Sequence, residues 1–182
     1  MFDWIVSHLI SDYFSFINKK FSLPYVSTIG IPCYIKTWKL SNNSIFNVKI
    51  NDTSGQKRFR NINEGYYKRA DICILIYDIT NQNSFKECEE YFIPKILENC
   101  QKNIHVLLMG NKSDCIEKRK ISKEEGIKLA FSNFFYFIET TCTQIEKVAE
   151  CFSQMITIYD EINQKREYIN LEGNTNNKKN CC

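Results

Sequence analysis

Glycine is scarce in this chain of 182 residues, which has only six glycines, the first of them Gly30. A phosphate-binding loop of the GxxxxGK[ST] type depends on glycines, because its backbone N–H groups must approach the phosphates closely. Such a loop also places a lysine against the β- and γ-phosphates and a Ser or Thr against Mg²⁺. The N-terminal part of the sequence therefore carries no phosphate-binding loop of this type.

Histidine, paired cysteines and long apolar runs are also lacking. The two histidines, His8 and His105, stand alone, and the nine cysteines show no CxxC spacing, which argues against a zinc site or a disulfide framework. We expect the cysteines to be reduced thiols of a cytoplasmic protein, several of them in the core. No run approaches the roughly 18 apolar residues that span a bilayer, and we expect no secretory signal at the N-terminus. The formal net charge is +3, so we expect no nucleic-acid partner.

The composition is that of an ordinary soluble globular protein, with 43% hydrophobic and 25% charged residues. The length suits one domain with a hydrophobic core. We expect this domain to occupy residues 1–164. Residues 165–180 are polar and lack periodicity, which predicts a disordered linker that ends in Cys181-Cys182.

Apolar residues near the N-terminus recur three and four positions apart, as the side chains on one face of a helix do. They are Phe2, Ile5, Val6, Leu9, Ile10, Tyr13, Phe14 and Ile17. This spacing predicts an amphipathic helix, with Pro24 beyond its end. Segments 31–40 and 44–51 then predict an antiparallel hairpin around the turn-rich residues 41–43.

From residue 72 onward, predicted strands alternate with predicted helices. Short apolar runs predict buried strands at 72–77, 104–109 and 135–138. Longer stretches predict helices at 84–98, 122–132 and 144–163. This alternation predicts an α/β fold with a mostly parallel sheet that is covered by helices on both faces.

Two loops that follow predicted strands carry chemically informative residues, and ligands of parallel sheets bind at the carboxyl ends of strands. In Asp52-Thr53-Ser54-Gly55-Gln56, the aspartate can hold Mg²⁺ through a water, and the glycine lets a backbone N–H approach a phosphate. In Asn111-Lys112-Ser113-Asp114, a carboxylate can accept two hydrogen bonds from the N1–H and amino group of guanine. Either loop alone could be an ordinary turn, but their order, each after a strand, favours a nucleotide site.

These motifs resemble those of the Rab family of Ras-like small GTPases, from about Phe16 to the C-terminus. The matching segments are Tyr25 to Gly30 (effector loop), Asp52 to Phe59 and Tyr66 to Ala70 (switch II), Asn111 to Asp114 (guanine specificity), Glu139 to Thr143 (last base-contacting loop) and Cys181-Cys182 (double geranylgeranylation).

The resemblance implies a role for each matched residue. Nucleotide contacts are implied for Asp52, Thr53, Ser54, Gly55, Gln56, Asn111, Lys112, Ser113, Asp114, Thr141, Cys142 and Thr143. Thr28 and Asp52 would hold Mg²⁺, and Gln56, as the catalytic residue, would orient the attacking water. The implied effector region comprises Ser27, Thr28, Ile29, Gly30, Ile31, Cys33 and Tyr66, and the implied lipidation sites are Cys181 and Cys182.

The resemblance also implies the small-GTPase fold, with the family's first strand and phosphate-binding loop missing or replaced by the N-terminal helix. The implied cofactors are GTP or GDP, Mg²⁺ and a geranylgeranyl lipid. The implied partners are a membrane, reached through the lipid, a prenylation escort protein, and Rab effectors and regulators. We expect a monomer at the cytoplasmic face of a membrane, with a cytosolic pool.

The sequence departs from the family at several contact positions. Ser54 replaces the usual alanine and Thr143 replaces a lysine, while the Phe-Trp-Tyr triad that Rabs present to effectors is here Cys33, Asn51 and Tyr66. Three hypotheses stand. One is a membrane-anchored GTP/GDP switch of vesicle trafficking whose sequence is incomplete at the N-terminus, which the guanine motif favours. Another is a prenylated pseudo-GTPase adaptor that neither binds nor hydrolyses GTP, which the missing loop and depleted triad favour. The third is the product of a non-functional gene remnant.

Overall fold

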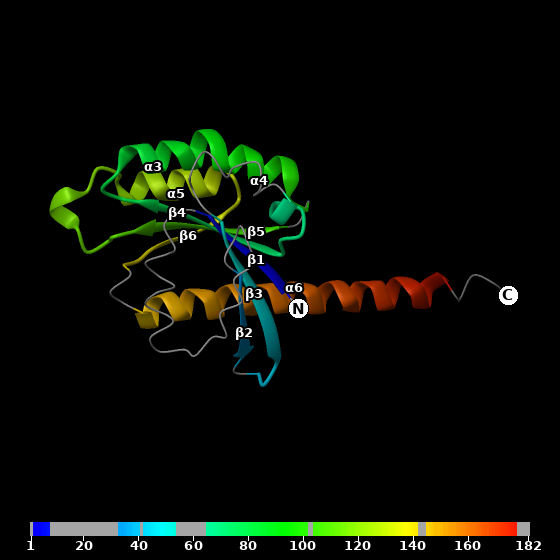
Figure 1. The fold of residues 1–182 in the computed structure, drawn as a ribbon. Coiled ribbons are helices and arrows are strands. Elements are labelled where there is room, and N and C mark those ends of the chain that lie inside the picture. The colour runs from blue at the N-terminus through cyan, green and yellow to red at the C-terminus, as the bar shows by residue number, and fades with distance from the viewer. Residues whose placement is uncertain are drawn as a thin grey trace.

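A computed structural model of the chain describes residues 2–7, 33–40, 42–53, 65–101, 104–141 and 145–177, of which 2–7 and 165–177 are described by their backbone alone. Its centre is a six-stranded sheet in the order β2-β3-β1-β4-β5-β6 (Figure 1). The strands are β1 Phe2–Ser7, β2 Cys33–Lys39, β3 Ile45–Thr53, β4 Ile72–Asp78, β5 His105–Asn111 and β6 Tyr136–Glu139. Only the β2–β3 pairing is antiparallel. The predicted α/β fold, the hairpin and the three later strands are confirmed.

The central strand β1 corrects the prediction for the N-terminus. Trp4 pairs with Ile50 of β3 on one side and with Ile72 of β4 on the other, both in parallel. The predicted helix is therefore wrong for residues 2–7, and so is the predicted loss of the first strand. Periodicity alone cannot separate a short buried strand from a helix, whereas unpaired buried backbone groups on β3 and β4 would cost about 1–3 kcal/mol each. Residues 8–32, which hold the rest of the predicted helix, lie outside the described residues.

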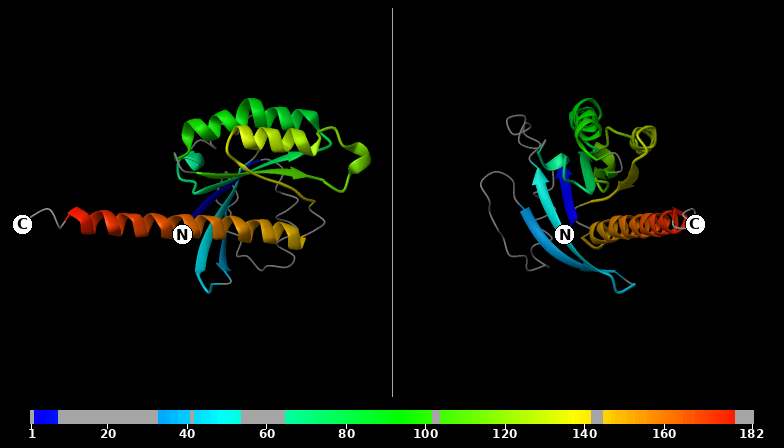
Figure 2. Two further views of the ribbon diagram at one scale, coloured as in Figure 1. Left: turned by 180° about the vertical axis from the view of Figure 1, so that it is seen from behind. Right: turned by 90° about the vertical axis from the view of Figure 1, so that its right-hand side faces the viewer.

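Helices cover both faces of the sheet (Figures 1 and 2). On one face lie α3 Gln82–Glu87, the π-helical turn η2 Cys88–Phe92, α4 Ile93–Asn99 and α5 Lys123–Ser132, with the short 3-10 turn η3 Ile116–Lys118 before α5. On the other face lies α6 Ile145–Asn177. The helix predicted at 84–98 is confirmed, but a π-helical turn precedes Pro94, where Ile93 N–H donates to the Cys88 carbonyl. Proline has no N–H to give the preceding turn, which explains a widened turn at this point.

The strand β4 is buried along its whole length and divides the core in two. Ile74 and its neighbours on the same face pack against Phe152 and Met155 of α6. Leu75 and its neighbours on the opposite face pack against Phe92 and the other helices. Cys73, Cys88 and Cys151 are buried, as expected for core thiols. This double packing fixes where the strands end, and therefore where the loops after them begin.

The last helix is longer than predicted. It passes residue 164, the expected end of the domain, without a break and continues through Asn177, projecting beyond the sheet (Figures 1 and 2). The predicted disordered linker is therefore wrong for residues 165–177. The chain has no proline between Gln164 and Asn177, so nothing in the backbone stops a helix that the packed part has already nucleated. Cys181 and Cys182 lie outside the described residues.

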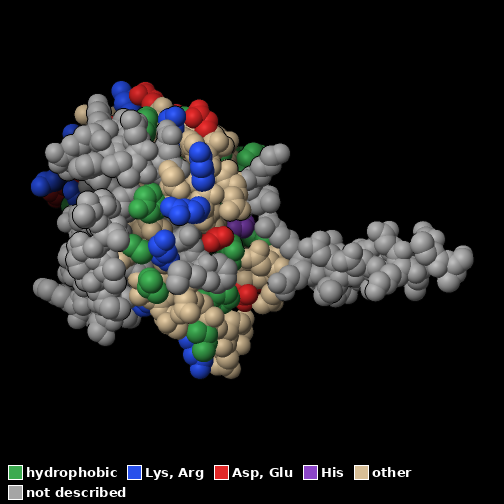
Figure 3. Space-filling view, turned by 45° about the vertical axis from the view of Figure 1, so that its right-hand side comes forward, with side chains coloured by type: hydrophobic (Ala, Val, Ile, Leu, Met, Phe, Trp, Pro, Cys, Tyr) green, Lys and Arg blue, Asp and Glu red, His purple; other side chains and the backbone are tan. Residues whose placement is uncertain are grey.

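The described surface carries both signs of charge. Figure 3 shows Lys and Arg side chains interspersed with acidic and hydrophobic ones over one face of the molecule. Within the described residues, no helix is long and apolar enough to cross a membrane. The absence of a nucleic-acid partner stays a prediction.

Candidate functional site

The informative loops begin at one edge of the sheet, where the parallel strands have their carboxyl ends. Ser7 of β1 pairs with Thr53 of β3, and Asp78 of β4 pairs with Asn111 of β5. Next in the sheet, Gly110 pairs with Glu139 of β6. The structure thus brings the loops after β3, β5 and β6 to a single edge, as expected for a nucleotide site in a parallel sheet.

The loop from Asn111 to Asp114 is held by its own hydrogen bonds. The buried side chain of Asn111 accepts the backbone N–H of Lys112 through Oδ1 at 2.6 Å. Lys112 has a φ of 65°, in the left-handed region that residues other than glycine rarely adopt. Its carbonyl accepts the N–H of Cys115 at 2.9 Å. The Asp114 side chain at the end of this turn is exposed, so its carboxylate is open to a ligand.

The segment after β6 forms a second wall beside this loop. Ser113 N–H donates to the Thr140 carbonyl at 3.1 Å, and Thr140 N–H donates to the Gly110 carbonyl at 2.9 Å. Thr140 and Thr141 are both buried, and Thr140 Oγ1 has no hydrogen-bond partner among the described residues. Cys142 and Thr143 lie outside the described residues.

An ion pair fixes the start of that segment. The Arg119 guanidinium donates to both carboxylate oxygens of Glu139, at 2.7 and 2.8 Å, and also to the Ile121 carbonyl at 3.0 Å. The hydrogen bonds with Glu139 outweigh partial burial and raise the pKa of Arg119. This bidentate pair ties the connection after β5 to the end of β6.

Asp78, at the end of β4, is a residue of this edge that sequence reasoning missed. Its Oδ2 lies 2.6 Å from the Lys112 ammonium, and its Oδ1 accepts the Thr80 N–H at 2.8 Å and the Thr80 hydroxyl at 2.7 Å. Burial on its own would raise the pKa of Asp78, but the hydrogen bonds from Lys112 and Thr80 hold the pKa below its usual value. The available signal was its position, a carboxylate directly after a fully apolar strand.

Asp52 is the described candidate for Mg²⁺. It is the second-last residue of β3 and half-buried, and burial raises the pKa of its carboxyl to about 6. A desolvated carboxylate gains from a nearby cation, and Mg²⁺ takes one or two carboxylates together with phosphate oxygens and waters. Within the described residues, no group of three or more His, Cys, Asp and Glu side chains could hold a metal ion by itself. Asp52 fits such a shared site. Thr28, Ser54, Gly55 and Gln56 lie outside the described residues.

Two positions of the expected effector triad are cross-strand neighbours. Cys33 at the start of β2 pairs with Asn51 of β3. Asn51 is buried, with 2% of its surface exposed, so it offers little contact area. Tyr66, the third position, is half-buried, and the Arg69 guanidinium lies 5.6 Å from the centre of its ring. Residues Ser27, Ile29, Gly30 and Ile31 of the expected effector region lie outside the described residues.

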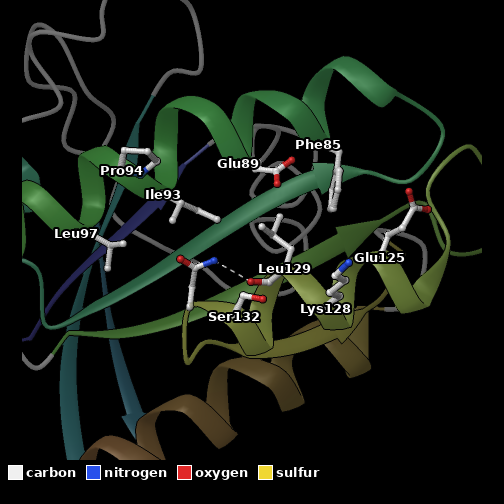
Figure 4. Close-up of a pocket in the computed structure, with 10 residues that line it drawn as sticks. Phe85, Glu89, Ile93, Pro94, Leu97, Glu125, Lys128, Leu129 and Ser132 are labelled. Atoms are coloured by element: carbon white, nitrogen blue, oxygen red, sulfur yellow. Dashed lines mark hydrogen bonds between the residues drawn. The ribbon is translucent and has the colours of Figure 1, made fainter.

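A separate groove of about 610 Å³ lies between the α3–α4 helices and α5 (Figure 4). Half of its lining residues are apolar, namely Phe85, Ile93, Pro94, Leu97 and Leu129. The other half are polar or charged, namely Glu89, Glu125, Lys128, Ser132 and Asn133. A hydrogen bond from Asn133 to the Leu129 carbonyl, 2.9 Å long, closes the end of α5 (Figure 4). None of the predicted site residues lines this groove.

Comparison with known proteins finds one matching family and many relatives. The model of the Ras family matches residues 10–161. Ras-related protein Rab-11B of Dictyostelium discoideum is 33% identical over 177 residues, 96% of this chain and 78% of the relative. Ras-related protein Rab-8B of Homo sapiens is 37% identical over 161 residues, 88% of this chain and 77% of the relative. Ras-related protein Rab-13 of Canis lupus familiaris is 39% identical over 140 residues, 77% of this chain and 68% of the relative.

Proposed function

From the premise that this chain belongs to the Ras family as a Rab-like small GTPase, we propose that it recognises guanine nucleotides at the carboxyl edge of its sheet. We further propose that it does so as a membrane-anchored GTP/GDP switch in intracellular vesicle traffic. The observation that carries the proposal is the ordered loop from Asn111 to Asp114, braced against the buried Thr140 and Thr141.

Guanine recognition follows from the chemistry of that loop. The exposed carboxylate of Asp114 can accept the N1–H and the amino group of guanine together, which adenine cannot match. A site built on such a pair rejects the wrong base by about 10⁴ or more, because its polar groups would be left unpaired.

The phosphates would be held by Asp52, near the end of β3, and by residues of the matched motifs. Asp52 would hold Mg²⁺ through a water, with Thr28 as a further ligand, and the ion would neutralise charge on the phosphates. Gln56 would orient the attacking water. Ser54 and Gly55 would contribute backbone N–H groups.

A second candidate, the pseudo-GTPase adaptor, is favoured by a specific observation. The stretch that follows β1 has no glycine before Gly30 and no lysine before Lys19. A phosphate-binding loop in that stretch would lack the glycines whose backbone N–H groups contact the phosphates. It would also lack the lysine on which the family's loop depends. Such a protein would bind its partners without cycling between nucleotides.

Either function would use a lipid anchor on the cytoplasmic face of a membrane. Cys181 and Cys182 end the chain as a double geranylgeranylation site would, after recognition by an escort protein. The helical residues 165–177 would hold the domain about 20 Å from the lipid, at about 1.5 Å per residue. Two lipid chains anchor a protein stably where one does so only marginally.

Calorimetric titration of the purified protein with GTP, guanosine and adenosine tests the proposal. Guanosine bound in preference to adenosine supports guanine recognition. GTP bound much more tightly than guanosine supports the switch. Absence of binding to all three, in a folded protein, would refute guanine recognition and support the adaptor, which binds no GTP.

A further inference from the structure

The ion pair between Asp78 and Lys112 joins the ends of two neighbouring strands at the proposed guanine site. We infer that Asp78 is a positioning residue for guanine recognition, whose carboxylate holds Lys112 in the left-handed conformation that shapes the loop to Asp114. The inference rests on the proposed function, since guanine is the ligand proposed for that loop.

Asp78 is itself rigidly placed. It is buried, with 6% of its surface exposed, and both of its carboxylate oxygens have partners. Its backbone N–H donates to the Ser84 hydroxyl at 3.0 Å, which ties the end of β4 to α3. The Thr80 contacts occupy Oδ1 and leave Oδ2 directed at the Lys112 ammonium, 2.6 Å away. The Asp78 carboxylate is therefore held in one position and can restrict the side chain of Lys112, which it binds.

The backbone conformation of Lys112 needs stabilisation by other groups. Its φ of 65° is unfavourable for a residue with a Cβ atom. The backbone hydrogen bonds on either side of it, to Asn111 Oδ1 and from Cys115 N–H, form with Lys112 in this conformation. If Lys112 returned to a common conformation, the chain would leave the turn and Asp114 would lose its place. The ion pair links the side chain of this strained residue to the rigid end of β4.

Asp78→Asn removes the charge and keeps the shape, so it tests the hold directly. Without it, we expect the left-handed conformation of Lys112 to be less populated, because only the backbone hydrogen bonds would still support it. Since the Lys112 side chain is 42% exposed, solvent screens part of the ion pair, and we expect the affinity for guanosine to fall about two- to fivefold. Hydrogen exchange of the Lys112 and Cys115 amides should accelerate by a similar factor in the nucleotide-free protein. Glu98→Gln is the matched control, because it breaks an exposed pair with Lys95 that spans 3.2 Å, away from the site.

Lys112→Gly separates positioning from a general structural role. Glycine adopts a positive φ without help, so in a Lys112→Gly background the further change Asp78→Asn should alter neither amide exchange at Cys115 nor guanosine affinity. An equal loss in both backgrounds would overturn the inference, since Asp78 would then act through Thr80 or Ser84. Unchanged exchange in the single variant Asp78→Asn would also overturn it.

The two readouts keep this inference apart from the proposed function. Amide exchange needs no nucleotide, so a response to Asp78→Asn that Lys112→Gly abolishes supports the hold on the loop. If the wild-type protein then binds no guanosine, the proposed function fails while the loop positioning stands.

Discussion

Substitution of Phe134 can measure how much free energy of unfolding a left-handed residue costs in this fold. Phe134 follows the last turn of α5 with a φ of 58°. Its N–H donates to the Phe131 carbonyl at 3.2 Å, and the Phe135 N–H donates to the Ala130 carbonyl at 2.9 Å. This pair of bonds is the Schellman motif, whose left-handed position is usually glycine. The phenylalanine ring is 95% exposed, so its burial compensates for little of the strain.

Phe134→Gly should therefore stabilise the protein. Relief of the left-handed conformation contributes about 1–2 kcal/mol, and the greater freedom of glycine in the unfolded chain offsets about 0.4–1 kcal/mol of it. The net gain of about 1 kcal/mol should raise the midpoint of thermal unfolding by about 2–4 °C. Urea unfolding with an unchanged m-value would give the same free energy independently.

Phe134→Ala is the control that separates the backbone from the ring. Alanine removes the exposed ring but keeps a Cβ atom at the same φ, so we expect stability within about 0.5 kcal/mol of the wild type. If Phe134→Gly were no more stable than Phe134→Ala, the reasoning from left-handed strain would be refuted.

Four further predictions concern the site and the anchor. Glu139→Gln leaves its arginine partner without a counter-charge and should lower the free energy of unfolding by about 1.5–3 kcal/mol in urea. Asp114→Asn should shift preference from guanosine to xanthosine in competition titrations, and an unchanged preference would show that Asp114 does not touch the base. Gln56→Leu should slow GTP turnover without weakening GTP binding, and the reverse pattern would contradict its catalytic role. Serine at both Cys181 and Cys182 should move the protein from the membrane to the cytosol in cell fractionation, and an unmodified C-terminal peptide from native protein would refute the anchor.

Much of the fold could be predicted from the sequence, because its signals there are local. The hairpin shows alternating segments around a turn, and β4 and β5 are short strands with a continuous apolar run inside them. β1 could not be predicted in this way, because Phe2–Ser7 fits a helical stripe as well as a buried strand. Only its pairing with β3 and β4 decides between them, and that pairing joins residues far apart in the chain.

In the candidate site too, the residues adjacent in the sequence could be predicted, whereas contacts between distant residues could not. The residues from Asn111 to Asp114 stand together in the sequence and could be identified as one motif. The bond between Asp78 and Lys112 joins two loops and has no local signature. The length of α6 was also missed, since polar residues without periodicity predict disorder unless a packed helix already precedes them.

The presence of β1 changes what the missing glycines mean. Without that strand, β3 and β4 would each expose a row of unpaired backbone groups inside the protein, and the whole domain would be in doubt. With β1 in place, the sheet is continuous, and the glycine-rich loop is missing only from the sequence that follows Ser7. Fold and phosphate binding are therefore separable in this chain. The domain can keep the guanine loop, and the surface that an escort protein would recognise, whether or not the γ-phosphate is ever held, so an adaptor and a switch would share this same architecture.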